Sequence, residues 1–330
     1  MSVHTIAFFN NKGGVGKTTL IYHLAHRLAD EGHRVLLADF DPQSNLSAMC
    51  LDDERLEQLW AHEGAGRKTI RGAVEPLVQG IGDVASPHIE ELTPSLALLP
   101  GDIRLATFES NLSSAWSECV DRRPPGFRVT SSLHRALQMA ALEHQATVAM
   151  IDVGPNLGAI NRAALLGAEH IVIPLGADLF SIQGLRNLAP MLGAWRMEWE
   201  SRLELNPVAD LELPAGRLQP LGYVVMQPAV YAGRVTRAYE RWLSRIPAEY
   251  AALKERTIEH GLSVNNDPAC LGVLRHYRSL MPLAQEARKP IFHLTTADGA
   301  LGAHLSAARK AGEEFGQIAR SLLERIGSLA

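Results

Sequence analysis

A glycine-rich loop near the amino end constrains this chain more than any other feature. It reads Lys12-Gly-Gly-Val-Gly-Lys-Thr-Thr19, follows an apolar run over residues 4–10, and opens a segment with helical spacing over residues 18–31. Glycine reaches backbone conformations that side chains exclude, so the N–H groups of such a loop can turn inward as a nest for phosphate oxygens. The following helix adds the positive end of its dipole. The loop therefore predicts a phosphate site between a buried strand and a helix.

Each polar residue of this loop has a chemical role in nucleotide binding. Lys17 neutralises the β and γ phosphates, Thr18 offers its hydroxyl to Mg²⁺, and Thr19 can reach the α-phosphate. The backbone contacts are expected at Gly13, Gly14, Val15 and Gly16. The alternative is a glycine-rich turn that binds nothing, but the strand before the loop, the helix after it and the Lys-Thr pair argue against that. We expect ATP and Mg²⁺ as cofactors.

Short apolar runs alternate with helical patterns along the chain, which predicts buried parallel strands joined by crossover helices. The expected strands cover residues 4–10, 34–39, 96–99, 147–152, 170–174 and 221–226. The predicted fold class is α/β: a P-loop NTPase with a mostly parallel, twisted sheet flanked by helices, helical insertions and a helical carboxyl-terminal part.

The motifs are spread from Lys12 to Pro290, which favours one domain over residues 1–330. Within it we expect an insertion of helices and loops at about residues 51–94 and a helix-rich, basic part at about 231–330. A short strand is predicted at residues 290–294. The two prolines in the segment 121–128 predict a loop and exclude a helix there.

Carboxylates follow two of the predicted strands. Asp39 and Asp41 lie at the carboxyl end of the second strand, and Asp152 ends the apolar run 148–152 in a Walker B pattern. Ligands of open parallel sheets bind at this edge. Asp152 is the candidate for holding Mg²⁺ through water.

A second lysine, Lys12, stands at the head of the glycine run. With it, residues 12–18 resemble the KGGxGKT signature of the deviant Walker A ATPases, the ParA/MinD family, and the chain is closest to ParA-like partitioning ATPases. The resemblance implies that Lys12 reaches the nucleotide of a second subunit in an ATP-sandwich homodimer. A cation supplied in this way stabilises charge on the transferring phosphoryl group. A solvated loop charge is the alternative for Lys12.

The resemblance also covers the switch regions. Residues 38–45 are similar to the family's DxDPQxN switch I, which implies that Asp41 orients the attacking water and that Asp39 supports the site. After Asp152 the family usually has Asp-x-Pro-Pro-Ser, whereas this chain continues Val-Gly-Pro-Asn. Gly154 can still present an N–H to the γ-phosphate. Lys12, Lys17 and Asp41 are thus the expected catalytic residues.

Similarity to the family continues through residues 157–185 and 280–291. Met226 and Gln227 stand where family members place the strand and loop beside the adenine, although those members commonly have Thr or Asn there. These two residues are the expected base contacts.

In this family the nucleotide assembles a dimer that binds a surface, and a partner triggers its release. DNA is one surface to consider. Residues 221–330 hold 14 Lys+Arg and 10 Asp+Glu, a net charge of +4, which leaves −8 for residues 1–220. A helix over about residues 231–245 would align four arginines on one face. They are Arg234, Arg237, Arg241 and Arg245.

Phosphate contacts from this arginine stripe would give sequence-independent, salt-sensitive DNA binding. The alternative is a solvated or internally paired helical face. The implied function is ATP-timed, non-specific DNA binding for DNA partitioning or cargo positioning. Release would follow hydrolysis stimulated by a ParB-like or other adaptor protein.

Two other functions use the same fold. MinD-like relatives bind membranes through a basic terminal amphipathic helix, but the polar face of the last 20 residues is nearly neutral, so a core-packed helix is the better interpretation. Metabolic ATPases of this fold include electron-transfer proteins with cluster-ligating cysteines. Neither Cys119 nor Cys270 stands in that context.

Composition bears on the compartment. The three cysteines lie far apart, and neither a signal segment nor an 18-residue apolar run is found. We therefore expect a cytoplasmic, nucleoid-associated protein.

Overall fold

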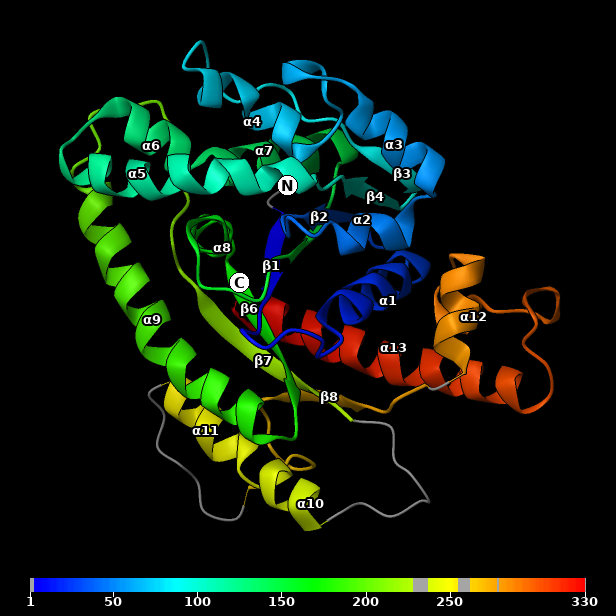
Figure 1. The fold of residues 1–330 in the computed structure, drawn as a ribbon. Coiled ribbons are helices and arrows are strands. Elements are labelled where there is room, and N and C mark those ends of the chain that lie inside the picture. Colours follow the sequence, from blue (N-terminus) through cyan, green and yellow to red (C-terminus); the bar gives the residue numbers. More distant parts are fainter. Residues whose placement is uncertain (1–2, 228–236, 255–261, 278, 330) are drawn as a thin grey trace.

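The computed structural model describes residues 3–227, 237–254, 262–277 and 279–329. Within these residues, eight strands form one sheet in the order β3-β4-β2-β5-β1-β6-β7-β8 (Figure 1). Every neighbouring pair is parallel except β3 and β4. The strands are β1 (His4–Phe8), β2 (Val35–Asp39), β3 (Glu90–Thr93), β4 (Leu96–Leu99), β5 (Val148–Asp152), β6 (His170–Gly176), β7 (Gln219–Met226) and β8 (Cys270–Leu274).

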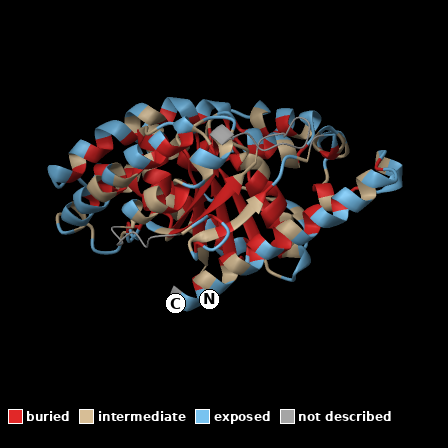
Figure 2. Cartoon of the chain, turned by 90° about the horizontal axis from the view of Figure 1, so that it is seen from below, coloured by how far each residue is buried: buried red, intermediate tan, exposed pale blue. Residues whose placement is uncertain are grey.

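Helices cover both faces of this sheet. One face packs against α4, α5, α7, α8 and α9, and the other against α1, α2, α3 and α13. Figure 2 shows the buried strands between helices whose outer sides are exposed. The helices are α1 (Lys17–Asp30), α2 (Asn45–Cys50), α3 (Asp53–Ala61), α4 (Ile70–Gln79), α5 (Glu109–Val120), α6 (Pro124–Thr130), α7 (Ser132–His144), α8 (Ala159–Leu166), α9 (Leu179–Leu203), α10 (Arg237–Leu243), α11 (Ile246–Leu253), α12 (Leu280–Ala287) and α13 (Ala303–Leu329).

The predicted fold class is confirmed, and so are its six strands, with ends that differ by a few residues. The predicted strand–loop–helix unit at the amino end is β1, the glycine loop and α1. Gly32 has a positive φ of 90°, a conformation that favours glycine and ends the helix region where the sequence predicted.

Two predictions in the carboxyl-terminal part are wrong. Residues 290–294 hold a 3-10 turn at Ile291–His293 instead of a strand. The last strand of the sheet is β8, in a segment expected to be helical. A glycine interrupts its apolar run because a Cβ on Gly272 would lie 2.5 Å from the side chain of Ile318 on α13. Close packing of α13 on β8 thus requires glycine at position 272, and this glycine weakens the apolar pattern that would have predicted a strand.

Two further predictions fail between residues 51 and 130. The segment 51–94 contains helices and loops as expected, but it also contains the edge strand β3, which pairs antiparallel with β4. The prolines of residues 121–128 begin helix α6 instead of excluding it, because Pro124 and Pro125 stand at its first turn. Proline is compatible with that position, where the missing N–H has no helical acceptor.

The carboxyl-terminal helix α13 packs on α1 and on the sheet. Its apolar residues Phe315, Ile318, Leu322 and Ile326 are at most 3% exposed. The core-packed interpretation of this helix is therefore confirmed. Among the described residues, no helix combines the length and apolar character that crossing a bilayer would need.

The sheet brings three strand ends together below the glycine loop. In register, Phe8 of β1 lies opposite Asp152 of β5, and Asp152 lies opposite Asp39 of β2. All three are the last residues of their strands. This juxtaposition of strands far apart in the sequence creates the candidate site.

Candidate active site

The glycine loop has the backbone that phosphate binding requires. Gly14 and Gly16 have φ angles of 72° and 85°, in the left-handed region, and α1 begins directly afterwards at Lys17. A Cβ on Gly16 would come 3.0 Å from the Cε atom of Met226, so the loop packs closely against the end of β7. Conformation and packing both call for glycine at this position.

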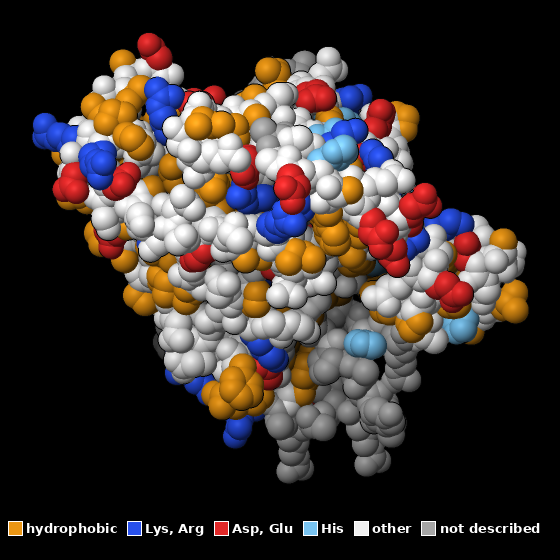
Figure 3. Space-filling model, turned by 45° about the horizontal axis from the view of Figure 1, so that its top comes forward, with side chains coloured by type: hydrophobic (Ala, Val, Ile, Leu, Met, Phe, Trp, Pro, Cys, Tyr) orange, Lys and Arg blue, Asp and Glu red, His pale blue; other side chains and the backbone are white. Residues whose placement is uncertain are grey.

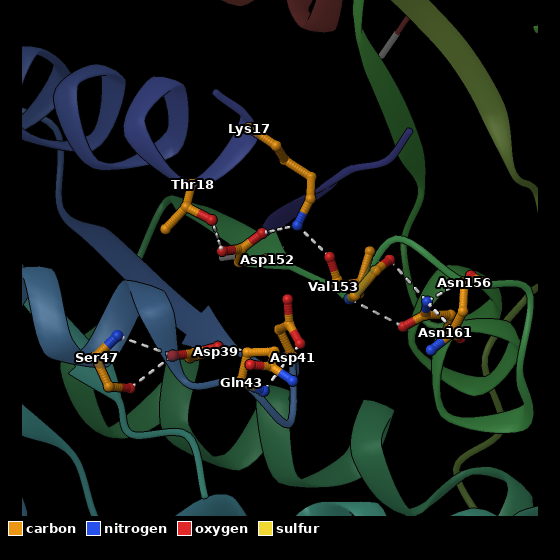
Figure 4. A network of polar contacts seen from close by, with 11 residues as sticks. Lys17, Thr18, Asp39, Asp41, Gln43, Ser47, Asp152, Val153, Asn156 and Asn161 are labelled. Carbon is orange, nitrogen blue, oxygen red and sulfur yellow. Dashed lines mark hydrogen bonds and ion pairs between the residues drawn. The ribbon is translucent and has the colours of Figure 1, made fainter. Parts of the chain in front are cut away.

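Lys17 and Thr18 converge on Asp152 (Figure 4). The ammonium group of Lys17 donates to Asp152 Oδ1 and to the carbonyl oxygen of Val153, and Thr18 Oγ1 donates to Asp152 Oδ2 at 2.7 Å. Lys17 is 8% exposed and Asp152 is fully buried. A buried charge requires such partners. Lys17, Thr18 and Asp152 thus form one hydrogen-bonded group. The sequence predicted the first as a phosphate ligand and the other two as Mg²⁺ ligands.

Asp39 is held by α2 rather than by a cation. Its Oδ2 accepts hydrogen bonds from the N–H and hydroxyl of Ser47, at 2.8 and 2.7 Å. Complete burial, together with the charge of Asp152, raises the pKa of Asp39 well above its usual range. Burial also raises the pKa of Asp152, against the opposing effect of Lys17. Asp39 is therefore fixed at the end of β2 by Ser47, a partner that the sequence did not reveal.

Asp41 lies above this group, at 6% exposure. Its Oδ1 accepts a hydrogen bond from the backbone N–H of Gln43 at 3.0 Å, and the same atom would lie 3.4 Å from a Cβ built on Gly154. Asp41 and Gly154 are therefore neighbours. The carboxylate expected to orient water faces the loop that follows Asp152.

That loop is fastened by Asn161 of α8. The N–H of Gly154 donates to Asn161 Oδ1 at 3.2 Å, and Asn161 Nδ2 donates to the carbonyl oxygens of Gly154 and Asn156 at 2.8 and 2.6 Å. The N–H that the sequence suggested for a γ-phosphate is thus engaged by a side chain. Asn161 was not predicted, because nothing in the sequence connects it to Gly154.

Lys12 contacts the beginning of α9. Its Nζ donates to Asp178 Oδ2 at 2.7 Å, and its N–H donates to Asn10 Oδ1 at 2.8 Å. Asp178 is the N-cap residue of α9 and accepts a hydrogen bond from the N–H of Ser181 at 3.0 Å. Partial burial opposes ionisation, but the hydrogen bonds from Lys12 and Ser181 outweigh it and hold the pKa of Asp178 below its usual range. Lys12 is therefore paired within its own chain.

Two cavities adjoin the glycine loop. One of about 700 Å³ is lined by Gly13, Thr18, Asp41 and residues of α12 such as Gln285. The other, of about 370 Å³, is lined by Met226, Gln227 and Tyr277. Both also border on Lys12, Gly14, Val15, Gly16 and Thr19. The predicted phosphate and base contacts therefore line two neighbouring cavities that share these residues of the loop. The sequence did not predict the α12 contribution or Tyr277.

The arginine stripe is only partly described. Arg234 lies outside the described residues, and Arg237 is the first residue of α10, which ends at Leu243. The predicted continuous helix over 231–245 is therefore wrong at its end, where Arg245 precedes the separate helix α11. Arg241 is exposed and stacks over the ring of Trp242, with 4.9 Å between Cζ and the ring centroid. Arg245 stacks over the same ring and pairs with Glu249 at 3.6 Å.

Comparison with known sequences places the chain in a family. A family model described as "AAA domain" matches residues 3–205. The chain is 30% identical over 243 residues to the chromosome-partitioning ATPase Soj of Thermus thermophilus, covering 72% of this chain and 74% of Soj. It is 29% identical over 206 residues to the chromosome partitioning protein ParA of Caulobacter vibrioides, covering 62% of this chain and 68% of ParA.

Solved structures share the fold over nearly the whole chain. Protein DIP2308 from Corynebacterium diphtheriae is 26% identical with a TM-score of 0.72, covering 99% of this chain and 100% of that one. A plasmid partition protein from Borrelia burgdorferi bound to AMPPNP is 18% identical with a TM-score of 0.59, covering 98% and 99%. Sequence motif, site geometry and relatives agree: this chain belongs to the ParA/MinD-type P-loop ATPases.

Proposed function

We propose that this chain binds and hydrolyses Mg²⁺-ATP and uses the nucleotide to time the assembly of a dimer on DNA, for DNA partitioning or cargo positioning. The observation that carries the proposal is the convergence of Lys17, Thr18 and Asp152 beside the left-handed glycine loop. The relatives named as partitioning ATPases support the cellular role. Residues 1–330 act as one unit in this proposal, because strands from both ends of the chain build the sheet.

The donor set at Asp152 fits Mg²⁺. Hard cations of this kind take oxygen ligands, and Thr18 Oγ1 and Asp152 Oδ2 are oxygen atoms 2.7 Å apart at the edge of the phosphate loop. Thr18 would ligate the ion directly and Asp152 through water. When bound, the ion neutralises charge on the β and γ phosphates.

ATP binding would redistribute the contacts of Lys17. Its ammonium group lies on Asp152 and on the carbonyl oxygen of Val153, and a triphosphate in the loop offers it stronger acceptors. The backbone N–H groups from Gly13 to Gly16 would cradle the phosphates, and Thr19 would reach the α-phosphate. Met226 and Gln227 line the adjoining cavity, which supports their role as base contacts.

In the proposed mechanism, hydrolysis depends on a positioned water molecule. Asp41 is a buried carboxylate that faces Gly154, next to the position that the γ-phosphate would take. It would orient the attacking water for in-line displacement. Lys12 of a second subunit would stabilise the developing charge, which makes the dimer the hydrolytic form.

The proposed surface is DNA, bound without sequence specificity. Arg241 is exposed, and Arg245 follows four residues later, although Glu249 offsets part of the charge of Arg245. Figure 3 shows basic and acidic side chains interspersed over the face that it draws, so DNA affinity would come from local contacts that a dimer doubles. A ParB-like or other adaptor protein would stimulate hydrolysis and release. The protein would then be found in the cytoplasm, on the nucleoid.

The test combines turnover with DNA retention. The full chain with Mg²⁺ is incubated with ATP, ADP or no nucleotide, and retention on random-sequence duplex DNA is measured at low and high salt. The proposal predicts ATP hydrolysis, and retention that needs ATP and disappears at high salt. Turnover without DNA retention would contradict the DNA part, and ATP-dependent sedimentation with anionic liposomes would favour a membrane surface instead.

A further inference from the structure

A second group of chemically active side chains lies at the amino edge of the sheet, opposite the phosphate loop. His4 begins β1, Glu169 immediately precedes β6, and His170 begins it. His170 lies opposite Ile6 in the β1–β6 register, and His4 is two residues from Ile6, so both imidazoles project from the same face of the sheet. The N–H of Glu169 donates to the carbonyl oxygen and the hydroxyl of Thr5, at 3.1 and 2.9 Å. Strand pairing therefore fixes the three residues beside one another.

The three side chains place candidate metal-ligand atoms near one another. One ligand atom from each residue lies within 4.8 Å of the other two, and this is the only such group of His, Cys, Asp and Glu in the described part of the chain. His4 Nδ1 and Glu169 Oε2 are 3.7 Å apart. Ligand atoms around a tetrahedral zinc ion are roughly 3.4 Å apart, as bond lengths of about 2.0–2.1 Å require. Small rotations of the partly exposed side chains of His4 and Glu169 would bring the three ligand atoms to this spacing.

His170 supplies an independent observation. It is 6% exposed, and its Nδ1 atom is buried without a hydrogen-bond partner among the described residues. A neutral imidazole nitrogen is the form that ligates metals. A buried nitrogen without a hydrogen-bond partner is unfavourable. A metal bound to this side chain would fix the orientation of its ring.

The site is accessible from solvent. The side chains of His4 and Glu169 are 34% and 37% exposed. Glu169 also lines a cavity of about 870 Å³ that is bordered by α7 and by residues 212 and 215–217. Water could complete the coordination of an ion held by the partly exposed side chains.

We propose that His4, Glu169 and His170 bind a divalent transition-metal ion, with Zn²⁺ as the best fit. Two imidazoles and one carboxylate form a donor set that zinc favours, and Mg²⁺ does not, because hard cations prefer oxygen ligands. The ion would join the start of β1 to the start of β6. This site is separate from the one for Mg²⁺-ATP, so zinc binding does not depend on nucleotide.

The experiment uses the full chain, freed of metal with a chelator and kept without nucleotide. Zn²⁺ is titrated by calorimetry, Co²⁺ by visible absorption, and thermal unfolding is recorded with and without Zn²⁺. The proposal predicts one Zn²⁺ per chain with micromolar or tighter affinity, tetrahedral Co²⁺ bands, and a Tm raised by Zn²⁺. Affinity should fall at least tenfold in His4→Ala and His170→Gln but stay unchanged in His62→Ala, which alters an exposed histidine elsewhere.

Three results would overturn the assignment. They are the absence of saturable Zn²⁺ binding, undiminished affinity in His4→Ala, and a cobalt spectrum dominated by thiolate charge transfer, which would place the ion on cysteine. His4 is partly exposed, so its replacement tests the site even if His170→Gln does not fold. ATP turnover by the Mg²⁺-loaded chain is measured separately, so failure of this proposal and failure of the ATPase proposal are distinguishable.

Discussion

Lys12 Nζ lies 2.7 Å from Oδ2 of Asp178, and this ion pair holds the lysine of the deviant loop against the first turn of α9. Both side chains are 34% exposed. In the proposed dimer the same ammonium group would contact the nucleotide of a second subunit. We therefore expect Lys12 to leave Asp178 when the dimer forms.

Replacing Asp178 by asparagine should make the ATP-dependent dimer form more readily. Asparagine caps a helix as well as aspartate does, so α9 keeps its N-cap while Lys12 loses its charged partner. An exposed pair contributes about 0.2–1 kcal/mol and each of the two subunits releases one pair, so the dimer dissociation constant should fall by roughly two- to thirty-fold. Sedimentation velocity with Mg²⁺-ATP measures this. Ser181→Ala is the control, because it alters a contact of Asp178 without removing the charge that holds Lys12. A weaker dimer in Asp178→Asn would contradict the expectation that Lys12 leaves Asp178 when the dimer forms.

Asp41→Ala should bind ATP and form the dimer but hydrolyse ATP at least ~100-fold more slowly, since a water-positioning group typically contributes 10²–10⁴ to the rate. Among the described residues, its Oδ1 accepts a local hydrogen bond from the N–H of Gln43, so the fold should persist. Single-turnover ATP hydrolysis and size-exclusion chromatography give the two readouts. Asp121→Ala, which alters an exposed carboxylate, should behave as wild type. Normal turnover in Asp41→Ala would exclude its assigned role.

The free energy of unfolding should decrease as the pH decreases, because His23 becomes protonated. This imidazole is fully buried, with Nδ1 on the carbonyl oxygen of Thr19 and Nε2 accepting from the N–H of Ile291. Burial is the main cause that lowers the pKa of His23 from 6.5 to about 4. A lowered pKa stabilises the fold above pH 6.5, and that stability is lost as pH falls from 6.5 toward 4, by roughly 3 kcal/mol in total.

Urea unfolding of wild type and His23→Gln between pH 7.5 and 4.5 tests this assignment. The difference in unfolding free energy between them should shrink as pH falls, since the variant has no imidazole to protonate at that position. His26, whose pKa is also lowered, is retained in both proteins, so the comparison isolates His23. A difference that does not change with pH would refute the assignment.

Arg241→Ala should weaken binding to random-sequence DNA and reduce the salt slope by about 1 per chain, as expected for the loss of one phosphate contact. Arg245→Ala should have a smaller effect, because Glu249 lies 3.6 Å from Arg245. Arg123→Ala, at the N-cap of α6, removes the same charge from another part of the surface and serves as the control. Equal losses in Arg241→Ala and Arg123→Ala would mean that net charge, rather than a defined surface, governs binding.

Local sequence predicted the parts of the site that are contiguous in the chain. The loop from Lys12 to Thr19 and the aspartates that end β2 and β5 could be predicted because strand, turn and helix follow one another within a few residues. Parallel pairing then places Asp39 and Asp152 side by side, as a sheet of this class requires.

The partners of these residues could not be predicted in the same way. Asp178 is 166 positions from Lys12, and Asn161 fastens Gly154 through side-chain geometry alone. A contact at a helix N-terminus could not be predicted either. The carboxylate of Glu109 accepts hydrogen bonds from the N–H groups of Ala159 and Ile160 at the start of α8. Such contacts depend on how helices pack on the sheet, which hydrophobic periodicity does not specify.

A mixing experiment tests most directly whether Lys12 acts on the nucleotide of a second subunit. Lys12→Ala retains Asp41, and Asp41→Ala retains Lys12, so neither protein alone should hydrolyse ATP. In a mixed dimer, the Lys12→Ala subunit holds ATP beside an intact Asp41 and receives Lys12 from its partner. We expect ATPase activity to reappear on mixing the two variants. A mixture as inactive as its components, under conditions in which sedimentation shows mixed dimers, would contradict the claim.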